Sequence, residues 1–214
     1  FAFTPSLVYN QALAGKYNKT ENAEVPYSKA MHGYGFKFNM NETIVARTYV
    51  GEYNTNVTYY IWSDSDGTEH YFLPQIDENG YTIYQDEDGL LLTLDVEGAS
   101  YSITDLNHNV RLFTKTTADS SSINAGGFLT GITDRNGNQL RFQYNDSGRI
   151  TSVQVIPKNN SAITYFKITH NSYGQVNRIL NENTQQAVIL YYSSAYNGTS
   201  ISPYNGGYLR KVVH

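Results

Sequence analysis

Apolar and polar residues alternate with a period of two along much of the chain. Residues 140–144 carry apolar side chains at every second position, and residues 164–168 have Thr, Phe and Ile at alternate positions. Residues 90–97 repeat this pattern with leucine and valine. A period of two is typical of β-strands with one buried face. Helical periodicity is weak, and the best helix candidate is a short stretch at residues 28–32. The sequence therefore predicts an all-β fold with very little helix.

Six tetrapeptides of the form Asx-x-x-Gly separate these alternating segments. A type I turn favours Asp or Asn at its first position, where the side chain accepts a backbone N–H, and Gly at its fourth, where φ can be positive. Residues 105–108 form a degenerate copy that ends in histidine. Such turns between β-type segments predict successive hairpins in a long antiparallel meandering sheet. The predicted structural turn residues are Asp64 and Gly67, Asp77 and Gly80, Asp86 and Gly89, Asp134 and Gly137, Asn145 and Gly148, and Asn171 and Gly174.

The spacing of these turns is irregular, which favours a meandering sheet over a solenoid of identical coils. Longer loops are expected at residues 114–125, 157–161 and 193–206, because these stretches are rich in Ser, Asn, Gly or Thr. No linker divides the chain cleanly, although its first 55 residues differ in pattern from the remainder.

Composition and charge narrow the range of partners. The chain has 214 residues and a formal net charge of -4, and its 15 Lys and Arg residues are scattered, so we expect no nucleic-acid partner. No apolar run is long enough to span a bilayer, so we expect no membrane insertion. Cysteine is absent, which removes disulfides and thiolate metal sites. The chain begins with Phe1 rather than Met, and we expect it to be a piece of a longer protein.

Residues 129–150 resemble the YD repeat of the RHS family. That repeat joins a strand that ends in Tyr-Asp to a strand that begins with Gly-Arg-Leu. The corresponding positions here are Tyr144-Asn145 and Gly148-Arg149-Ile150. Residues 170–176 resemble a decayed second copy, with His170 where Tyr would stand, and residues 207–212 resemble the beginning of a third.

The front of the chain also resembles RHS proteins. Residues 6–10 and 32–38 are similar to the entry segment that precedes the repeats, with Phe36 in place of the usual Trp. The resemblance implies an entry segment at residues 1–55 and a YD-repeat-like region of β-hairpins at residues 56–214, the latter as one continuous domain.

RHS proteins build a β-ribbon that spirals into a hollow shell around a C-terminal toxin or other cargo. The resemblance therefore implies a non-catalytic structural segment, a scaffold or part of a toxin-enclosing shell, in a large exported or cell-surface bacterial protein. Its expected partner is the rest of the parent polypeptide, including the toxin or cargo domain. Exposed sheet edges would also permit self-association through edge strands. The Asp-Pro of the family's closing self-cleavage motif does not occur in this sequence.

The sequence contains no motif typical of an enzyme or of a metal site. Its five histidines lack zinc-site spacing, and there is neither a nucleophile elbow nor a phosphate loop. Acidic turns at residues 64–66 and 86–88 lack the further ligands of a calcium loop, although stabilisation of these turns by Ca²⁺ stays open. We expect no catalytic residue, no cofactor and no metal ligand.

Aromatic side chains provide an alternative function. Tyr59, Tyr60, Trp62 and Tyr71 would form a stacking surface for sugar rings, as in a carbohydrate-binding or adhesive module that contacts cell-surface glycans. The simpler explanation is that these rings pack the sheet as cross-strand pairs. A second candidate group consists of Tyr191, Tyr192, Tyr196, Tyr204 and Tyr208.

Overall fold

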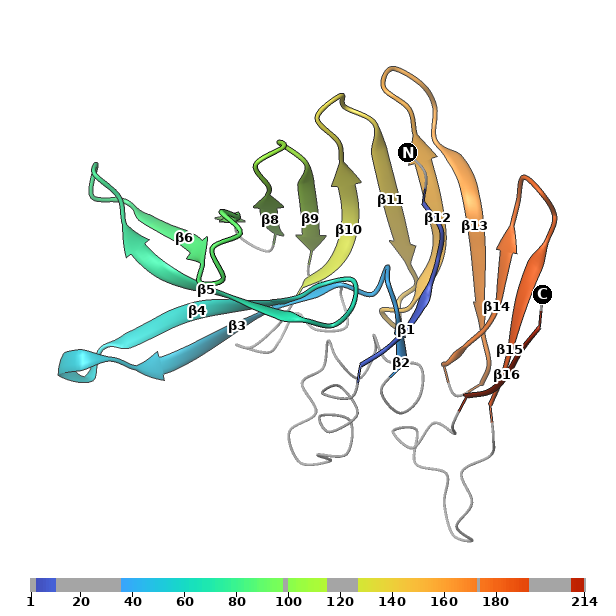
Figure 1. Ribbon diagram of the computed structural model, residues 1–214, viewed down its shortest axis with the longest axis horizontal. Coiled ribbons are helices and arrows are strands. Elements are labelled where there is room, and N and C mark those ends of the chain that lie inside the picture. The colour runs from blue at the N-terminus through green and yellow to red at the C-terminus, as the bar shows by residue number, and fades with distance from the viewer. Residues whose placement is uncertain are drawn as a thin grey trace, which may run out of the picture.

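The computed structural model describes residues 3–10, 36–97, 100–114, 127–172, 174–192 and 209–213. Within these ranges the chain forms β-strands and one short 3-10 turn, which confirms the predicted all-β fold (Figure 1). None of the described residues forms a helix long and apolar enough to cross a membrane. The candidate helix at residues 28–32 and nearly all of the predicted loops at 114–125 and 193–206 lie outside the described residues.

Two short strands, β1 (Leu7–Tyr9) and β2 (Phe36–Phe38), form an antiparallel ribbon. The two strands of this ribbon belong to the two segments that resemble an RHS entry segment. In Figure 1 the N-terminal segment crosses the face of the sheet near β11 and β12. The Phe3 ring lies 5.7 Å from the ring of Phe142 and 6.4 Å from that of Phe166, so the N-terminal segment covers part of the sheet's apolar face.

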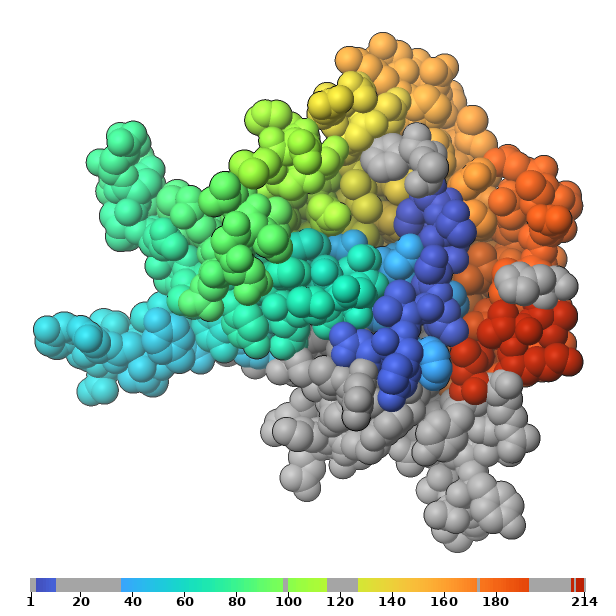
Figure 2. Space-filling view, viewed as in Figure 1, coloured from blue at the N-terminus to red at the C-terminus, as the bar shows by residue number. Residues whose placement is uncertain are grey.

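The other strands of the described residues form one antiparallel sheet of fourteen strands. Two projecting hairpins, β3–β4 and β5–β6, extend from the body of the molecule (Figure 2). The strands of the sheet are β3 (Thr43–Val50), β4 (Asn56–Ser63), β5 (Glu69–Ile76), β6 (Thr82–Asp86), β7 (Thr93–Glu97), β8 (Ser100–Thr104), β9 (Val110–Thr114), β10 (Gly127–Thr133), β11 (Gln139–Tyr144), β12 (Ile150–Ile156), β13 (Ile163–His170), β14 (Val176–Asn181), β15 (Ala187–Tyr192) and β16 (Leu209–Val213).

Strand β10 is a branch point in this sheet. One of its edges pairs with β9, while the other pairs first with β3, at Gly127 and Phe128, and then with β11, from Gly131 to Thr133. Strands β3 to β10 therefore close into a ring of eight neighbours, and β11 to β16 continue from it as an open meander. The predicted boundary at residue 55 lies in the turn between β3 and β4, which contains the 3-10 turn Glu52–Asn54, and the sheet continues across it.

The ring has two short seams. Strands β3 and β10 share two residue pairs, and β6 and β7 also share two, whereas β3 and β4 share eight. Backbone pairing alone therefore holds the ring weakly at these two places. Contacts between side chains near the seams would therefore help to stabilise the closed ring.

Alternation in the open meander agrees with the sequence pattern. Leu140 and Phe142 of β11 and Phe166 and Ile168 of β13 are buried, and each belongs to the main hydrophobic cluster. Their intervening residues point to the opposite face, as the period of two requires.

Residues 90–97 differ from the predicted strand. Strand β7 begins only at Thr93, and Leu90 and Leu91 are exposed in the loop before it. The Asp86 carboxylate accepts the backbone N–H groups of Leu90 and Leu92, which holds residues 86–92 in a wider loop than a four-residue turn. Leu92 reaches the core from this loop.

The other predicted turns share one geometry. In the turn at Asp134, the Gly137 N–H donates to the Asp134 carbonyl at 2.9 Å, and the Asn138 N–H donates to the Asp134 carboxylate at 2.9 Å. Gly137 has φ +87°, which glycine adopts without a side-chain clash. The same pair of hydrogen bonds occurs in the turns that begin at Asp64, Asp77, Asn145 and Asn171, and in the degenerate copy at Asp105, where His108 takes the glycine position with φ 60°.

Candidate functional site

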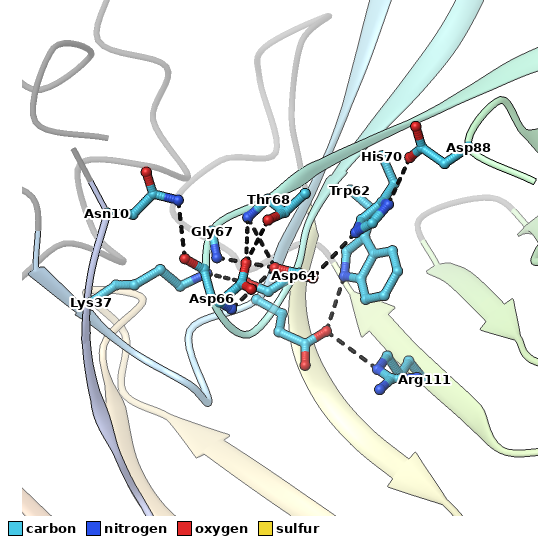
Figure 3. Close-up of polar contacts among 11 residues, drawn as sticks. Asn10, Lys37, Trp62, Asp64, Asp66, Gly67, Thr68, His70, Asp88 and Arg111 are labelled. Carbon is cyan, nitrogen blue, oxygen red and sulfur yellow. Dashed lines mark hydrogen bonds and ion pairs between the residues drawn. The ribbon is translucent and has the colours of Figure 1, made fainter. Parts of the chain in front are cut away.

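Polar and aromatic side chains from several distant parts of the chain meet around the single tryptophan (Figure 3). We call this group the Trp62 cluster. It combines residues of β2, β4, β5 and β9 with the segment before β3, the β4–β5 turn and the β6–β7 loop. Its members are Lys37, Glu42, Trp62, Asp64, Asp66, His70, Asp88 and Arg111.

Glu42 is the most buried carboxylate of the cluster, with 3% of its surface exposed. One of its oxygens accepts the indole N–H of Trp62 at 2.9 Å and forms an ion pair with Arg111 Nε at 3.4 Å. Burial raises the pKa of Glu42, while Arg111 and the indole N–H oppose that rise. The Glu42 carbonyl also accepts the N–H of Leu129 in β10 at 3.2 Å. Glu42 therefore links β3, β4, β9 and β10 at the first seam.

His70 lies between two carboxylates. Its Nδ1 is 2.8 Å from Asp88 Oδ2, and its Nε2 is 3.2 Å from Asp64 Oδ2. The imidazole packs against the Trp62 ring, with centroids 4.7 Å apart. His70 thereby connects β5 to the loop that joins the two strands of the second seam.

Lys37 attaches the β1–β2 ribbon to the ring. Its side chain is buried, and its ammonium donates to the Asp64 carbonyl. Burial lowers the pKa of Lys37 to about 8, although the carboxylates of Glu42, Asp64 and Asp66 oppose the change. A second link joins the Asn10 side-chain amide to the Asp66 carbonyl at 3.2 Å.

The cluster contains groups that also occur in active sites, but their partners are parts of the protein itself. A carboxyl group of raised pKa is a feature of catalytic acids. The Glu42 carboxylate, however, is buried against Trp62 and Arg111, and both ring nitrogens of His70 contact carboxylates. In the part of the chain that the structure describes, no group of three or more His, Cys, Asp or Glu residues could hold a metal ion. This arrangement is suited to holding strands together.

The predicted stacking residues lie on opposite faces of the sheet. Tyr60 and Trp62 are buried, and the Tyr60 ring packs against Tyr84 with centroids 5.0 Å apart. Tyr59 and Tyr71 belong to the other face, because successive residues of a strand alternate in direction. The four side chains therefore do not form one surface.

The outer face carries a different aromatic row. Tyr49 of β3, Tyr59 of β4 and Tyr71 of β5 lie side by side, with ring centroids 5.9 Å and 6.4 Å apart. Tyr49 is 46% exposed and Tyr71 is 36% exposed. Tyr49 was not among the predicted residues, and only the register of the β3–β4 hairpin places it in the row. In the second candidate group Tyr191 is exposed and Tyr192 is half-buried, while Tyr196, Tyr204 and Tyr208 lie outside the described residues.

Lys37, Glu42 and Arg111 were also absent from the predicted site. Each is an isolated charged residue in the sequence, without a motif around it. The only local signal is the position of Lys37 between two phenylalanines, where a cation is unusual in a buried strand.

The signature positions of the predicted repeat have defined structural roles. The Tyr144 hydroxyl donates to the Leu129 carbonyl at 2.7 Å, and burial raises the pKa of Tyr144. Tyr192 makes the same kind of bond to the Val176 carbonyl at 2.7 Å, two hairpins further along the meander. His170 ends the strand between them, and its Nε2 is buried without a hydrogen-bond partner among the described residues. Burial lowers the pKa of His170 to about 4.

The glycine and arginine positions of neighbouring turns also contact each other. A Cβ atom at Gly174 would overlap the guanidinium of Arg149, so the arginine of one turn lies directly against the glycine of the next. Gly174 also has φ +77°, which further favours glycine.

Comparison with protein families matches part of the chain. Residues 124–155, which include all of β10 and β11 and nearly all of β12, match the family described as RHS repeat. The matched segment contains Tyr144-Asn145 and Gly148-Arg149-Ile150, on which the predicted resemblance depended. The chain matches none of the curated proteins with which it was compared.

Proposed function

We propose that the chain, whose residues 124–155 match the RHS repeat, is a non-catalytic structural segment of a larger exported or cell-surface bacterial RHS/YD-repeat protein. It would serve as a scaffold or as part of a toxin-enclosing shell, with residues 1–55 as the entry segment and residues 56–214 as the hairpin region. The observation that carries this proposal is the match of residues 124–155 to the RHS repeat, and the architecture agrees with it. A closed ring, β3 to β10, leads into an open meander of hairpins, and the Trp62 cluster fastens the ring rather than a ligand.

The proposed partner is the rest of the parent polypeptide, including its toxin or cargo domain. Among the described strands β16 pairs with β15 alone, so its other edge is available for a further strand or for a second copy of the chain. A strand added at this edge would extend the meander in the direction in which it already grows.

Co-purification tests this function. We would express the chain and the remainder of its parent polypeptide as two separate proteins and measure their association by size-exclusion chromatography with light scattering. The proposal expects a stable complex that is weakened by Val212→Pro, because proline removes a backbone donor from β16. Val50→Pro, at the far end of the projecting β3–β4 hairpin, is the matched control and should leave association unchanged. A remainder that closes into a shell without binding the chain would contradict the proposal.

Carbohydrate binding is a second candidate, and the exposed row of Tyr49, Tyr59 and Tyr71 is the observation that favours it. Isothermal titration with a panel of bacterial wall and capsular polysaccharides tests it. Saturable binding that is lost in Tyr59→Ala and Tyr71→Ala, but kept in the exposed control Tyr81→Ala, would support this function. Substitution of Trp62 would not be informative, because the buried indole contributes to folding. Absence of binding across the panel would leave the structural function alone.

A further inference from the structure

The β6–β7 loop, residues 87–92, is a strained segment at the second seam of the ring. Leu91 has φ 55°, a left-handed conformation that costs a leucine about 1–2 kcal/mol. Leu90 and Leu91 are exposed, whereas Leu92 is buried in the core. Because β6 and β7 share only two residue pairs, the loop's own contacts must hold this part of the ring.

Three sets of contacts fasten the loop. The Asp86 carboxylate, at the end of β6, accepts the N–H groups of Leu90 and Leu92. The Glu87 N–H donates to the Tyr71 carbonyl at 3.0 Å. The third contact is the one between Asp88 and His70. Like the Glu87 contact, it joins the loop to β5, and it is the contact that involves a titratable ring.

The two contacts of His70 are hydrogen bonds only in one protonation state of its imidazole. An ionised carboxylate only accepts hydrogen bonds, and a neutral imidazole has a single N–H. With Asp88 at Nδ1 and Asp64 at Nε2, both contacts are hydrogen bonds only when the imidazole carries two protons. The ring is 9% exposed and packs on Trp62, so water has little access to compensate for a missing donor.

The other charged groups of the cluster lie one residue further away. Lys37 contacts the Asp64 carbonyl, and Arg111 lies over the Trp62 ring, 5.3 Å from its centroid. Asp66 is bonded to Thr68 in the turn, and Glu42 is bonded to the indole N–H. The two groups in direct contact with the imidazole are both carboxylates.

We propose that His70 is a proton-dependent latch: its imidazolium fastens the β6–β7 loop to β5, and loss of the proton releases the loop and loosens the second seam. Acidic conditions therefore favour the fastened ring and alkaline conditions favour the open loop.

Hydrogen exchange measured by mass spectrometry on the full chain tests the latch. Exchange is followed between about pH 5 and about pH 8, the interval in which histidine changes charge, and is corrected for the intrinsic pH dependence of amide exchange. Peptides that cover residues 87–92 should lose protection about tenfold or more as the pH rises, the effect expected for one hydrogen bond to a charged group. The β5–β6 turn at residues 77–81 has no histidine contact and is the internal reference.

Asp88→Asn is the decisive variant. A side-chain amide can donate to the unprotonated Nδ1, so the contact no longer requires an imidazolium and the loop should lose its pH dependence. Lys37 begins to titrate near the upper end of the interval, with a pKa of about 8, but it contacts Asp64 and is unaffected by this substitution. His70→Gln, whose side-chain amide can donate to Asp88 at every pH, should also remove the pH dependence of the loop.

Two results would contradict the proposed latch. Loop exchange in the wild type that follows the reference turn at every pH would overturn the latch. Equal pH dependence in the wild type and in Asp88→Asn would also overturn it. Because the Asp88 side chain is 47% exposed, Asp88→Asn provides a test even where His70→Gln fails to fold.

Discussion

Lys37 should make the folded protein more stable as the pH rises above neutrality. Burial lowers the pKa of its ammonium from 10.5 to about 8, because desolvation outweighs the attraction of the nearby carboxylates. The unfolded chain, in which this pKa returns to its ordinary value, therefore binds more protons than the folded chain between about pH 8 and about pH 10.5. Stability rises with pH wherever the unfolded state binds more protons. At ~1.4 kcal/mol per pKa unit, the full shift lowers the free energy of unfolding by about 3 kcal/mol at low pH. The folded protein regains about 2 kcal/mol of this between about pH 7 and about pH 9.5.

The measurement compares wild type with Lys37→Met by urea unfolding across that pH range, followed by the fluorescence of Trp62. The wild type should gain about 2 kcal/mol relative to the variant. Tyr60, whose pKa burial raises to about 12, acts in the opposite direction at higher pH, and the difference between the two proteins cancels its effect. Lys167→Met, at an exposed position, should keep the wild-type slope. Parallel pH profiles for wild type and Lys37→Met would refute the reasoning.

Three further substitutions test the contacts of the repeat and of the cluster. Tyr144→Phe should lower the free energy of unfolding by about 1–3 kcal/mol, because a main-chain carbonyl of β10 loses its hydroxyl donor; in the same urea assay the exposed control Tyr81→Phe should change it by less than ~0.5 kcal/mol. Gly174→Ala should destabilise more than Gly80→Ala, since both glycines have positive φ but only the former faces a neighbouring guanidinium; equal melting temperatures would contradict this contact. Trp62→Phe should cost about 2–4 kcal/mol by calorimetry, because the buried carboxylate loses its indole donor and a cavity forms.

The hairpin turns were predictable because their determinants are local. An Asx side chain accepts a backbone N–H four residues later, and glycine supplies the positive φ, so four or five consecutive residues contain the necessary information. The turn at Asp105 forms even without glycine, because His108 adopts the same left-handed conformation at the glycine position. The match of residues 124–155 to the RHS repeat was predictable for the same reason, because the signature residues lie within one hairpin.

Patterns of alternation were less informative where a polar side chain altered the backbone. Residues 90–97 have the period of a strand, but the Asp86 carboxylate accepts two of their backbone N–H groups. Strand β7 therefore begins only at Thr93. The stacking residues illustrate a second limit. Tyr59 and Trp62 are close in sequence, yet they lie on opposite faces, and their exposure depends on what covers each face of β4.

The Trp62 cluster could not be predicted, because its members meet only through the closure of the ring. Glu42 and Arg111 come together because β10 pairs with β3 on one edge and with β9 on the other. Such a branch depends on pairings between distant strands, which no local motif specifies. The physical logic becomes clear once the seams are known: two strand pairs with two residue pairs each are the weakest parts of the ring. Glu42 strengthens the first seam, and His70 with Asp88 strengthens the second. Charged side chains therefore supplement the short backbone pairing at both seams and help to close the ring.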